Sequence, residues 1–336
     1  MTSGNHNSLR VFTVIPRTPD SLRHTQDSLA LAQWSDANSC CGMLLFTGTS
    51  TPVEPWVLAQ SIIATSKHLE PIIAVNPAHM HPFMVARMIT SIAQIYQRKV
   101  HLNLIAGTSI GELSALGDTT KHEDRYRRLN EYSEILLSLI SSKRPVSSKG
   151  DFYQVNKLQL LPAVPQKLMP GLFVAGHSVF AAQIADRIAA SRMRMLPVQF
   201  DELKGVPAAL HFGVVTRDSW NAARDAAIEL FPYDDLGPEM LDVSVQNTDA
   251  TWKRGLHAEL KRGESSVPTV PGVWLHPFRM GQSDCPYLVG DREQVADILV
   301  NLAQQGNSTF VIETSVNTRE LNELAIVMSM VRSRLT

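Results

Sequence analysis

The chain has 336 residues, of which 44% are hydrophobic, and its 31 basic and 32 acidic side chains leave a formal net charge of −1. This balance argues against recognition of nucleic acid or of an anionic membrane through bulk charge, so we expect a small-molecule substrate, either free or carried by a protein. The three cysteines, Cys40, Cys41 and Cys285, have neither the number for a disulfide framework nor zinc-ligand spacing. No metal is therefore predicted.

The N-terminal stretch MTSGNHNSLR is polar and leads directly into a predicted strand, so it lacks the apolar core of a signal peptide. No apolar run approaches the roughly 20 residues that span a bilayer. We therefore expect a cytoplasmic protein without a membrane partner.

Short β-branched or leucine-rich runs alternate with longer amphipathic stretches, which predicts strand–helix units around a parallel sheet. The predicted parallel strands are 11–15, 43–46, 71–75, 100–105, 172–176, 192–196, 210–215 and 309–313. The predicted helices between the first strands are 21–38, 54–68, 82–97 and 122–142, and GDFYQVNKLQL (150–160) indicates a small antiparallel excursion. Eight such units favour a (β/α)8 TIM barrel with insertions over a doubly wound sheet, with the active site at the carboxyl ends of the strands.

We expect one barrel domain over residues 1–336. The segment 231–272 has weak periodicity and many turn residues. It is predicted to be an insertion that acts as a lid or faces the substrate.

Two glycine-containing turns follow predicted strands. GTSIG (107–111) lacks both the Gly-Lys-Ser/Thr ending of a phosphate loop and the G-x-G-x-x-G fingerprint, so its glycines suggest only a close backbone approach to a ligand. In LFVAGHSVFAAQIADRIA, Gly176, His177 and Ser178 lie between a strand and a helix, where amide groups, the helix dipole and a hydroxyl favour an anion. An ordinary Ser178 N-cap explains the same residues.

The stretch TKHEDRY (120–126) opens a helix and has two interpretations. Thr120 and Glu123 could form a capping box, which needs no function. Alternatively, His122 and Tyr126 project from one helix face, where an imidazole and a phenol can hydrogen-bond a flavin or a reacting oxygen and move a proton near neutral pH.

Six blocks of the chain, spread over residues 10–330, resemble the bacterial luciferase-like flavin monooxygenases in order and spacing, with alkanesulfonate monooxygenase as the member that aligns most closely. The blocks are LLFTGTSTPVEPWVLAQ, HPFMVARMITSIAQIY, HLNLIAGTSIGELSALGDTTKHEDRY, LFVAGHSVFAAQIA, HFGVVTRDSWNAARDAA and YLVGDREQVADILVNLAQQGNSTFVI. The resemblance implies a barrel that takes reduced FMN from a separate flavin reductase, forms a flavin C4a-peroxide with O2 and oxygenates a small organic substrate. It further implies a homodimer or homotetramer.

The resemblance also implies roles for individual positions. Catalysis would fall to His122 and Tyr126, and the flavin and its phosphate would contact Thr47, Asn76, Asn103, Gly107, Gly176, His177 and Ser178. The bond Val75–Asn76 is where the family often has a strained or cis peptide.

On the substrate side the chain departs from alkanesulfonate monooxygenase. Thr51 replaces a cysteine, His211 and Gly213 replace an arginine and a histidine, and Ser315 and Asn317 replace a tyrosine and a histidine. Arg279 would supply a cation near the barrel mouth. We therefore expect a substrate other than an alkanesulfonate. With LGDTT before its His-x-x-Arg-Tyr motif, the chain resembles the subgroup of this family found in natural-product (antibiotic) pathways. That resemblance implies a biosynthetic intermediate as substrate, free or tethered to a carrier protein.

Two alternatives stay open. One is an oxidoreductase of the same fold that transfers hydride with the deazaflavin F420 and uses no oxygen. The other is a non-catalytic flavin-binding partner protein, against which the retained pair of His122 and Tyr126 argues.

Overall fold

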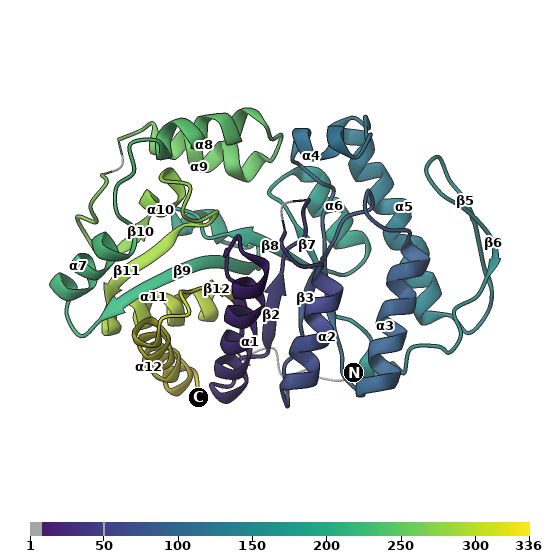
Figure 1. Ribbon diagram of the computed structural model, residues 1–336, viewed down its shortest axis with the longest axis horizontal. Helices are drawn as coiled ribbons and strands as arrows, with labels where there is room; N and C mark the ends of the chain where they lie inside the picture. Colours follow the sequence, from purple (N-terminus) through teal and green to yellow (C-terminus); the bar gives the residue numbers. More distant parts are fainter. Residues whose placement is uncertain (1–8, 50, 264) are drawn as a thin grey trace. The chain divides into compact units, whose positions relative to one another are not determined.

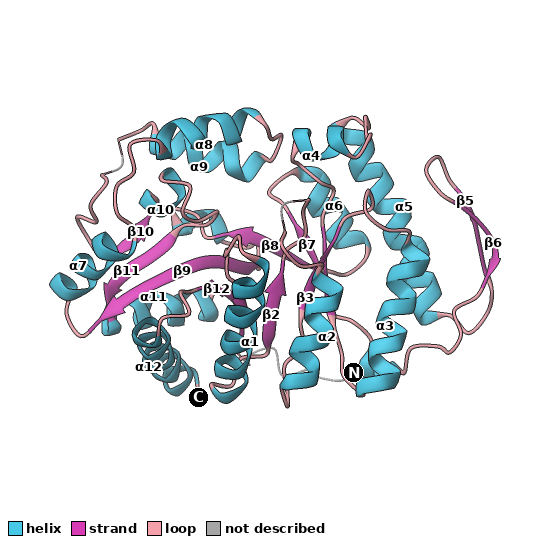
Figure 2. Cartoon of the chain, viewed as in Figure 1, coloured by secondary structure: helices cyan, strands magenta, loops and turns pink. Residues whose placement is uncertain are grey.

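The computed structural model describes residues 9–49, 51–263 and 265–336, so the polar segment 1–8 lies outside the described residues. Its main sheet has the strand order β10-β11-β9-β12-β1-β2-β3-β4-β7-β8, and β8 also pairs with β9. The eight strands β9, β12, β1, β2, β3, β4, β7 and β8 thus form a closed ring. The pairings β1–β12, β12–β9, β2–β3, β3–β4, β4–β7 and β8–β9 are all parallel. These pairings confirm the predicted (β/α)8 barrel. Figures 1 and 2 show the strands and helices that make up each part of the chain.

Of the described residues, those in 17–36 and 42–192 form one compact unit, called here the N-terminal unit, and those in 9–16, 37–41 and 193–336 form the C-terminal unit. The strands and helices of the N-terminal unit are α1 (Ser21–Ala37), β2 (Gly42–Leu45), α2 (Pro55–Thr65), β3 (Ile72–Val75), α3 (Pro82–Tyr96), β4 (His101–Leu104), α4 (Ile110–Ala115), α5 (His122–Ser141), β5 (Val146–Lys149), β6 (Gln154–Leu158), the 3-10 helix η1 (Gln166–Leu168), β7 (Leu172–Ala175) and α6 (Val179–Arg187).

The C-terminal unit contains the remaining elements. They are β1 (Arg10–Val14), most of β8 (Ser191–Met195), the 3-10 helix η2 (Phe200–Leu203), β9 (Ala209–Arg217), α7 (Trp220–Leu230), α8 (Gly237–Gln246), α9 (Thr251–Leu260), β10 (Gly272–Trp274), α10 (His276–Arg279), β11 (Tyr287–Asp291), α11 (Arg292–Gln304), β12 (Thr309–Glu313) and α12 (Thr318–Leu335).

The first three strands of the N-terminal unit are buried along their whole length, as is typical of a parallel sheet covered by helices. β2 (GMLL), β3 (IIAV) and β4 (HLNL) have only buried residues, and among these three strands β4 carries the polar side chains, His101 and Asn103. Helix α3 starts as predicted with Pro82 in its first turn, where the missing N–H leaves no bond unmade. The eight predicted strands and the predicted helices are confirmed within a few residues at each end.

The antiparallel excursion after α5 is also confirmed, as the β5–β6 hairpin, which lies beyond α5 in Figure 1 and is joined to it by hydrogen bonds from the turn amides to Glu131. Its first strand, β5, begins at Val146 and precedes the predicted segment. The sequence did not indicate this strand because VSSK contains a single apolar residue.

The long strand β9 organises the C-terminal unit. Its first half pairs with β8 and β12, and its second half, from Gly213 to Arg217, pairs in parallel with β11. Strands β10 and β11 were not predicted from the sequence. Nor was the regular structure of segment 231–272, which contains helices α8 and α9, packed on the core around Phe278 through Leu241 and Leu256.

No helix among the described residues is both long enough and apolar enough to cross a membrane.

Candidate active site

Gly107, just after β4, packs against Asn76, just after β3. Gly107 has φ +80°, and a Cβ atom there would lie 3.0 Å from Asn76 Nδ2 and 3.3 Å from Leu113. Asn76 is buried, and its Oδ1 accepts a hydrogen bond from the Ala78 amide at 3.0 Å. A side chain at Gly107 would therefore meet both backbone strain and a steric obstacle. The glycine permits the close approach that the sequence suggested, and two predicted flavin contacts lie side by side.

Arg125 ties this loop to the start of α5. It is buried, and its Nε donates to the Gly107 carbonyl at 3.0 Å while Nη1 donates to the Thr120 carbonyl at 2.9 Å. Its Nη2 lies 3.4 Å from His122 Nδ1. Because a guanidinium can only donate, Nδ1 acts as the acceptor in this contact. Sequence reasoning missed Arg125, although it stands between the two predicted catalytic residues.

Tyr126 reaches from α5 to the end of β7. The His122 and Tyr126 rings meet edge to face with centroids 5.2 Å apart, and Tyr126 stacks on Phe180 of α6 at 5.6 Å. A Cβ atom on Gly176, which has φ +127°, would lie 3.3 Å from Tyr126 Oη. The phenol thus lies against the predicted phosphate turn. The Tyr126 and Phe180 rings also line a cleft of about 250 Å³ between α5 and α6.

The turn at residues 176–178 leads directly into α6. Ser178 is the N-cap, and its Oγ accepts the Ala181 amide at 3.1 Å. The ordinary capping role is therefore real. It leaves the other amides of the first turn and the positive end of the helix dipole directed at the same spot, which suits a phosphate.

The capping-box interpretation of Thr120 and Glu123 is wrong. Helix α5 begins at His122, and its N-cap, Lys121, makes no side-chain capping bond. Thr120 lies one residue too early, and its Oγ1 accepts instead from Arg128 at 3.4 Å. Glu123 lies exposed in the first turn, where its negative charge interacts favourably with the positive end of the helix dipole.

A second ion pair stabilises the same loop. Arg128 Nη2 donates to Asp118 Oδ2 at 2.6 Å, and the Thr120 amide donates to Asp118 Oδ1 at 3.0 Å. Burial alone would raise the pKa of Asp118, but the hydrogen bonds from Arg128 and Thr120 outweigh it and hold that pKa at about 2. The carboxylate therefore stays charged at any physiological pH and fixes the approach to α5.

Asn103 lies on β4 between Ala74 of β3 and Phe173 of β7. It is 6% exposed, and within the described part of the chain its Oδ1 has no hydrogen-bond partner. A buried acceptor without a partner costs about 1 to 3 kcal/mol. Such an atom fits a site in which a ligand N–H completes the bond, as the ring nitrogens of a flavin can.

The loop after β2 is connected to the loop after β3 and to α4. Thr47 Oγ1 lies 3.3 Å from His79 Nδ1, and His79 Nε2 lies 3.4 Å from Glu112 Oε1. The same carboxylate oxygen accepts the Thr49 amide at 2.7 Å. His79 and Glu112 were missed by sequence reasoning. A histidine four residues past the end of β3 was the available signal.

The expected cis peptide at Val75–Asn76 is not found. Among the described residues the cis bond is Leu161–Pro162. Asn76 thus meets Gly107 without an unusual peptide bond.

Three of the predicted substrate residues lie in the C-terminal unit. His211 is buried on β9, with Nε2 4.0 Å from Glu313 Oε2. Arg279 ends α10, which begins at His276. Burial lowers the pKa of His276, and the positive charge of Arg279 lowers it further. Ser315 follows β12, and its Oγ accepts the Asn317 amide at 3.2 Å. The fourth, Thr51, lies in the N-terminal unit, where its amide donates to the Gly48 carbonyl at 3.1 Å.

The strand ends of the N-terminal unit therefore combine amide donors at a helix start, one buried acceptor without a partner, and an imidazole and phenol in contact. A comparison with known families matches residues 13–309 to the luciferase-like monooxygenases. The chain belongs to this family. The prediction of a flavin-dependent luciferase-like monooxygenase is thereby confirmed.

Two curated luciferase-like relatives cover most of the chain. The 4-(gamma-L-glutamylamino)butanoyl-[BtrI acyl-carrier protein] monooxygenase BtrO of Niallia circulans is 31% identical over 285 residues, 82% of this chain and 82% of its own length. The FMNH(2)-dependent dimethylsulfone monooxygenase of Pseudomonas putida is 23% identical over 321 residues, 89% of this chain and 84% of its own.

Solved luciferase-like structures share the fold. The oxygenating constituent of 3,6-diketocamphane monooxygenase from the CAM plasmid of Pseudomonas putida, in complex with FMN, superposes with a TM-score of 0.73 and 15% identity, covering 97% of this chain and 99% of its own. This agreement supports the barrel assignment.

Proposed function

We propose that this luciferase-like monooxygenase binds reduced FMN at the strand ends of its N-terminal unit and uses O2 to oxygenate a small organic substrate. One observation carries the proposal: the Tyr126 hydroxyl, next to His122, lies against the Gly176–Ser178 turn. The residues expected to act on the flavin and those expected to hold its phosphate, separate in the sequence, thus meet in one unit.

Each residue of this site has a distinct proposed role. The amides of the Gly176–Ser178 turn and of the first turn of α6 hold the phosphate. Asn103 Oδ1 accepts a ring N–H, and Asn76 and Gly107 form the wall along the ring. Bound reduced flavin supplies the two electrons that let one atom of O2 enter the substrate while the other leaves as water.

His122 and Tyr126 hold or move a proton beside the flavin. Arg125 Nη2, directed at His122 Nδ1, makes Nδ1 the acceptor and leaves Nε2 as the ring nitrogen available to the flavin side. The Tyr126 ring stacks on Phe180, and its hydroxyl lies against the turn at Gly176.

The substrate is proposed to be an intermediate of natural-product (antibiotic) biosynthesis attached to a carrier protein, because the BtrO relative is named for an acyl-carrier-protein substrate. Thr51, His211, Arg279 and Ser315 are proposed to line the substrate side. The segment 231–272 is proposed as an insertion that acts as a lid within a single barrel domain. A homodimer or homotetramer in the cytoplasm completes the proposal.

Reconstitution tests the function. With purified chain, FMN, NADH, a flavin reductase and O2, the carrier-bound substrate should gain one oxygen atom from 18O2, detected by mass spectrometry. Omission of the reductase or of O2 should abolish incorporation. Product formed with oxidised FMN and no reductant would contradict the proposal.

The main alternative is hydride transfer with F420. An F420-dependent secondary alcohol dehydrogenase shares the fold, with a TM-score of 0.67 and 14% identity, which supports the fold only. Anaerobic fluorescence titrations separate the two: tighter binding of FMN supports the monooxygenase, and tighter binding of the deazaflavin supports the alternative.

A further inference from the structure

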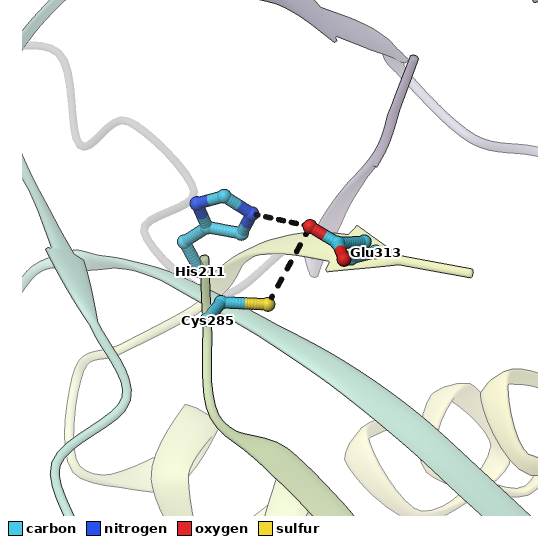
Figure 3. A group of neighbouring side chains, drawn as sticks. All are labelled: His211, Cys285 and Glu313. Carbon is cyan, nitrogen blue, oxygen red and sulfur yellow. Dashed lines mark hydrogen bonds and ion pairs between the residues drawn. The ribbon is translucent and has the colours of Figure 1, made fainter. Parts of the chain in front are cut away.

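The C-terminal unit contains three metal-ligating side chains that converge from distant parts of the chain. His211 lies on β9, Cys285 precedes β11 and Glu313 ends β12 (Figure 3). Their ligand atoms all lie within 4.8 Å of one another, and all three residues are buried. The first half of β9 and the end of β12 belong to the closed barrel, so Glu313 stands at the strand-end face where such barrels place their chemistry.

The distances are near those of a coordinated ion. Glu313 Oε2 lies 4.0 Å from His211 Nε2 and 3.7 Å from Cys285 Sγ. In a tetrahedral zinc site with bonds of about 2.0 to 2.3 Å, neighbouring N, O and S ligands lie about 3.3 to 3.6 Å apart. The two carboxylate distances exceed these values by less than 1 Å, and the imidazole and thiol, within 4.8 Å of each other, would move closer together on binding.

The carboxylate and the thiol are oriented by their neighbours. Tyr287 Oη donates to the other Glu313 oxygen, Oε1, at 3.3 Å. The Tyr287 ring lies directly on β9, since a Cβ atom at Gly213 would come within 2.2 Å of it. Ser283 Oγ accepts the Cys285 amide at 3.0 Å and lies 3.4 Å from Sγ. Outer hydrogen bonds of this kind orient ligands and tune metal affinity.

We propose that His211, Cys285 and Glu313 bind one zinc ion. The mixed N, S and O donors suit zinc, whereas calcium and magnesium take oxygen ligands. Binding forms the zinc–sulfur bond and releases the thiol proton to solvent. Three protein ligands leave the fourth position to a water molecule, as in catalytic zinc sites. Sequence spacing gave no sign of this site because each ligand comes from a different strand region.

A zinc titration of the chelator-treated full-length protein against a competing chromophoric chelator tests the proposal. One zinc should bind per chain, and Cys285→Ser and Glu313→Gln should each weaken binding at least about tenfold. The matched control is Cys41→Ser, which removes a partly exposed thiol outside the group and should leave the affinity unchanged. Unchanged zinc affinity in a folded Cys285→Ser protein, verified by circular dichroism, would overturn the proposal.

A measurement on the unaltered chain covers the case in which these buried substitutions prevent folding. Cobalt(II) in the same site should give the strong visible bands of tetrahedral coordination and a thiolate charge-transfer band in the near ultraviolet, and stoichiometric zinc should remove both. Failure to bind cobalt, or a weak octahedral spectrum without the thiolate band, would equally overturn it.

Discussion

Gly107 and Gly117 have similar backbones but different surroundings. Their φ values are +80° and +73°, yet a Cβ atom at Gly107 would lie 3.0 Å from Asn76 Nδ2, whereas at Gly117 it would meet nothing within 4 Å. The left-handed backbone penalises an alanine at either position by roughly 1 kcal/mol. Only at Gly107 does the new methyl group also displace a predicted flavin contact.

Gly107→Ala should therefore weaken binding of FMN roughly tenfold or more, about 1.4 kcal/mol. Gly117→Ala should lower stability by a similar backbone cost and leave FMN affinity unchanged. Fluorescence titration and thermal unfolding of both variants measure the two effects. Equal FMN affinities of the two variants would argue against Gly107 beside the ring.

His122 is the residue whose removal tests the chemistry most directly. His122→Ala should lower the oxygenation rate at least about 100-fold, the usual share of a positioned acid or base, while the thermal unfolding midpoint changes little. Lys121→Ala, at the preceding exposed N-cap without a capping bond, should keep full activity. Normal turnover of His122→Ala would assign the histidine a structural role only.

At the scale of elements, the start of α5 is held by two arginines of opposite character. Arg125 is buried and bonds the Gly107 and Thr120 carbonyls. Arg127 is exposed, and its partners Asp124 and Asp151 are surface carboxylates. Both arginines donate hydrogen bonds to oxygen acceptors. When Arg127 is removed, water can replace its hydrogen bonds, but when the buried Arg125 is removed, the two carbonyls lose their donor without replacement.

Arg125→Met should destabilise the protein by about 3 kcal/mol and impair FMN binding, because two carbonyls lose their donors and the loop after β4 is released. Arg127→Met should change stability by less than about 1 kcal/mol. Urea unfolding of both variants provides the comparison. If the two curves coincide, Arg125 does not connect loop and helix.

The Asp118–Arg128 pair predicts that the free energy of unfolding falls at acid pH. The pKa of Asp118 is lowered to about 2 in the folded chain, against about 3.9 when unfolded, so the pair stabilises fully above pH 4 and loses its contribution as the pH falls towards 2. The shift corresponds to roughly 2 kcal/mol. Asp118→Asn should remove that contribution at neutral pH and flatten the profile between pH 4 and 2. Asp201→Asn, in an exposed pair with Lys204, should leave the profile unchanged.

At the scale of the whole molecule, the proposed delivery of the substrate on a carrier protein can be tested by kinetics. If the substrate arrives on a carrier protein, the acyl group linked to its carrier should be oxygenated with a kcat/KM at least about tenfold above that of the free acid, because the carrier contributes binding energy remote from the reacting atoms. Steady-state kinetics with both forms measure this ratio. A preference for the free acid would point to a small-molecule substrate.

The sequence alone determined the barrel and the family, because period-two and 3.6-residue patterns and short local motifs are properties of neighbouring residues. It also determined the strand ends at which the active site is proposed. It also placed Asn76, Gly107 and the Gly176–Ser178 turn at such ends. The two interpretations of TKHEDRY could not be separated in this way, since they differ only in where α5 begins.

Tertiary structure decided what those motifs contact. It excluded the capping box, made Arg125 the link between loop and helix, and brought the Tyr126 hydroxyl to Gly176. It also gathered His211, Cys285 and Glu313 into one group. Contacts of this kind join residues far apart in the chain, and strand order and register, which no local pattern encodes, determine which side chains meet.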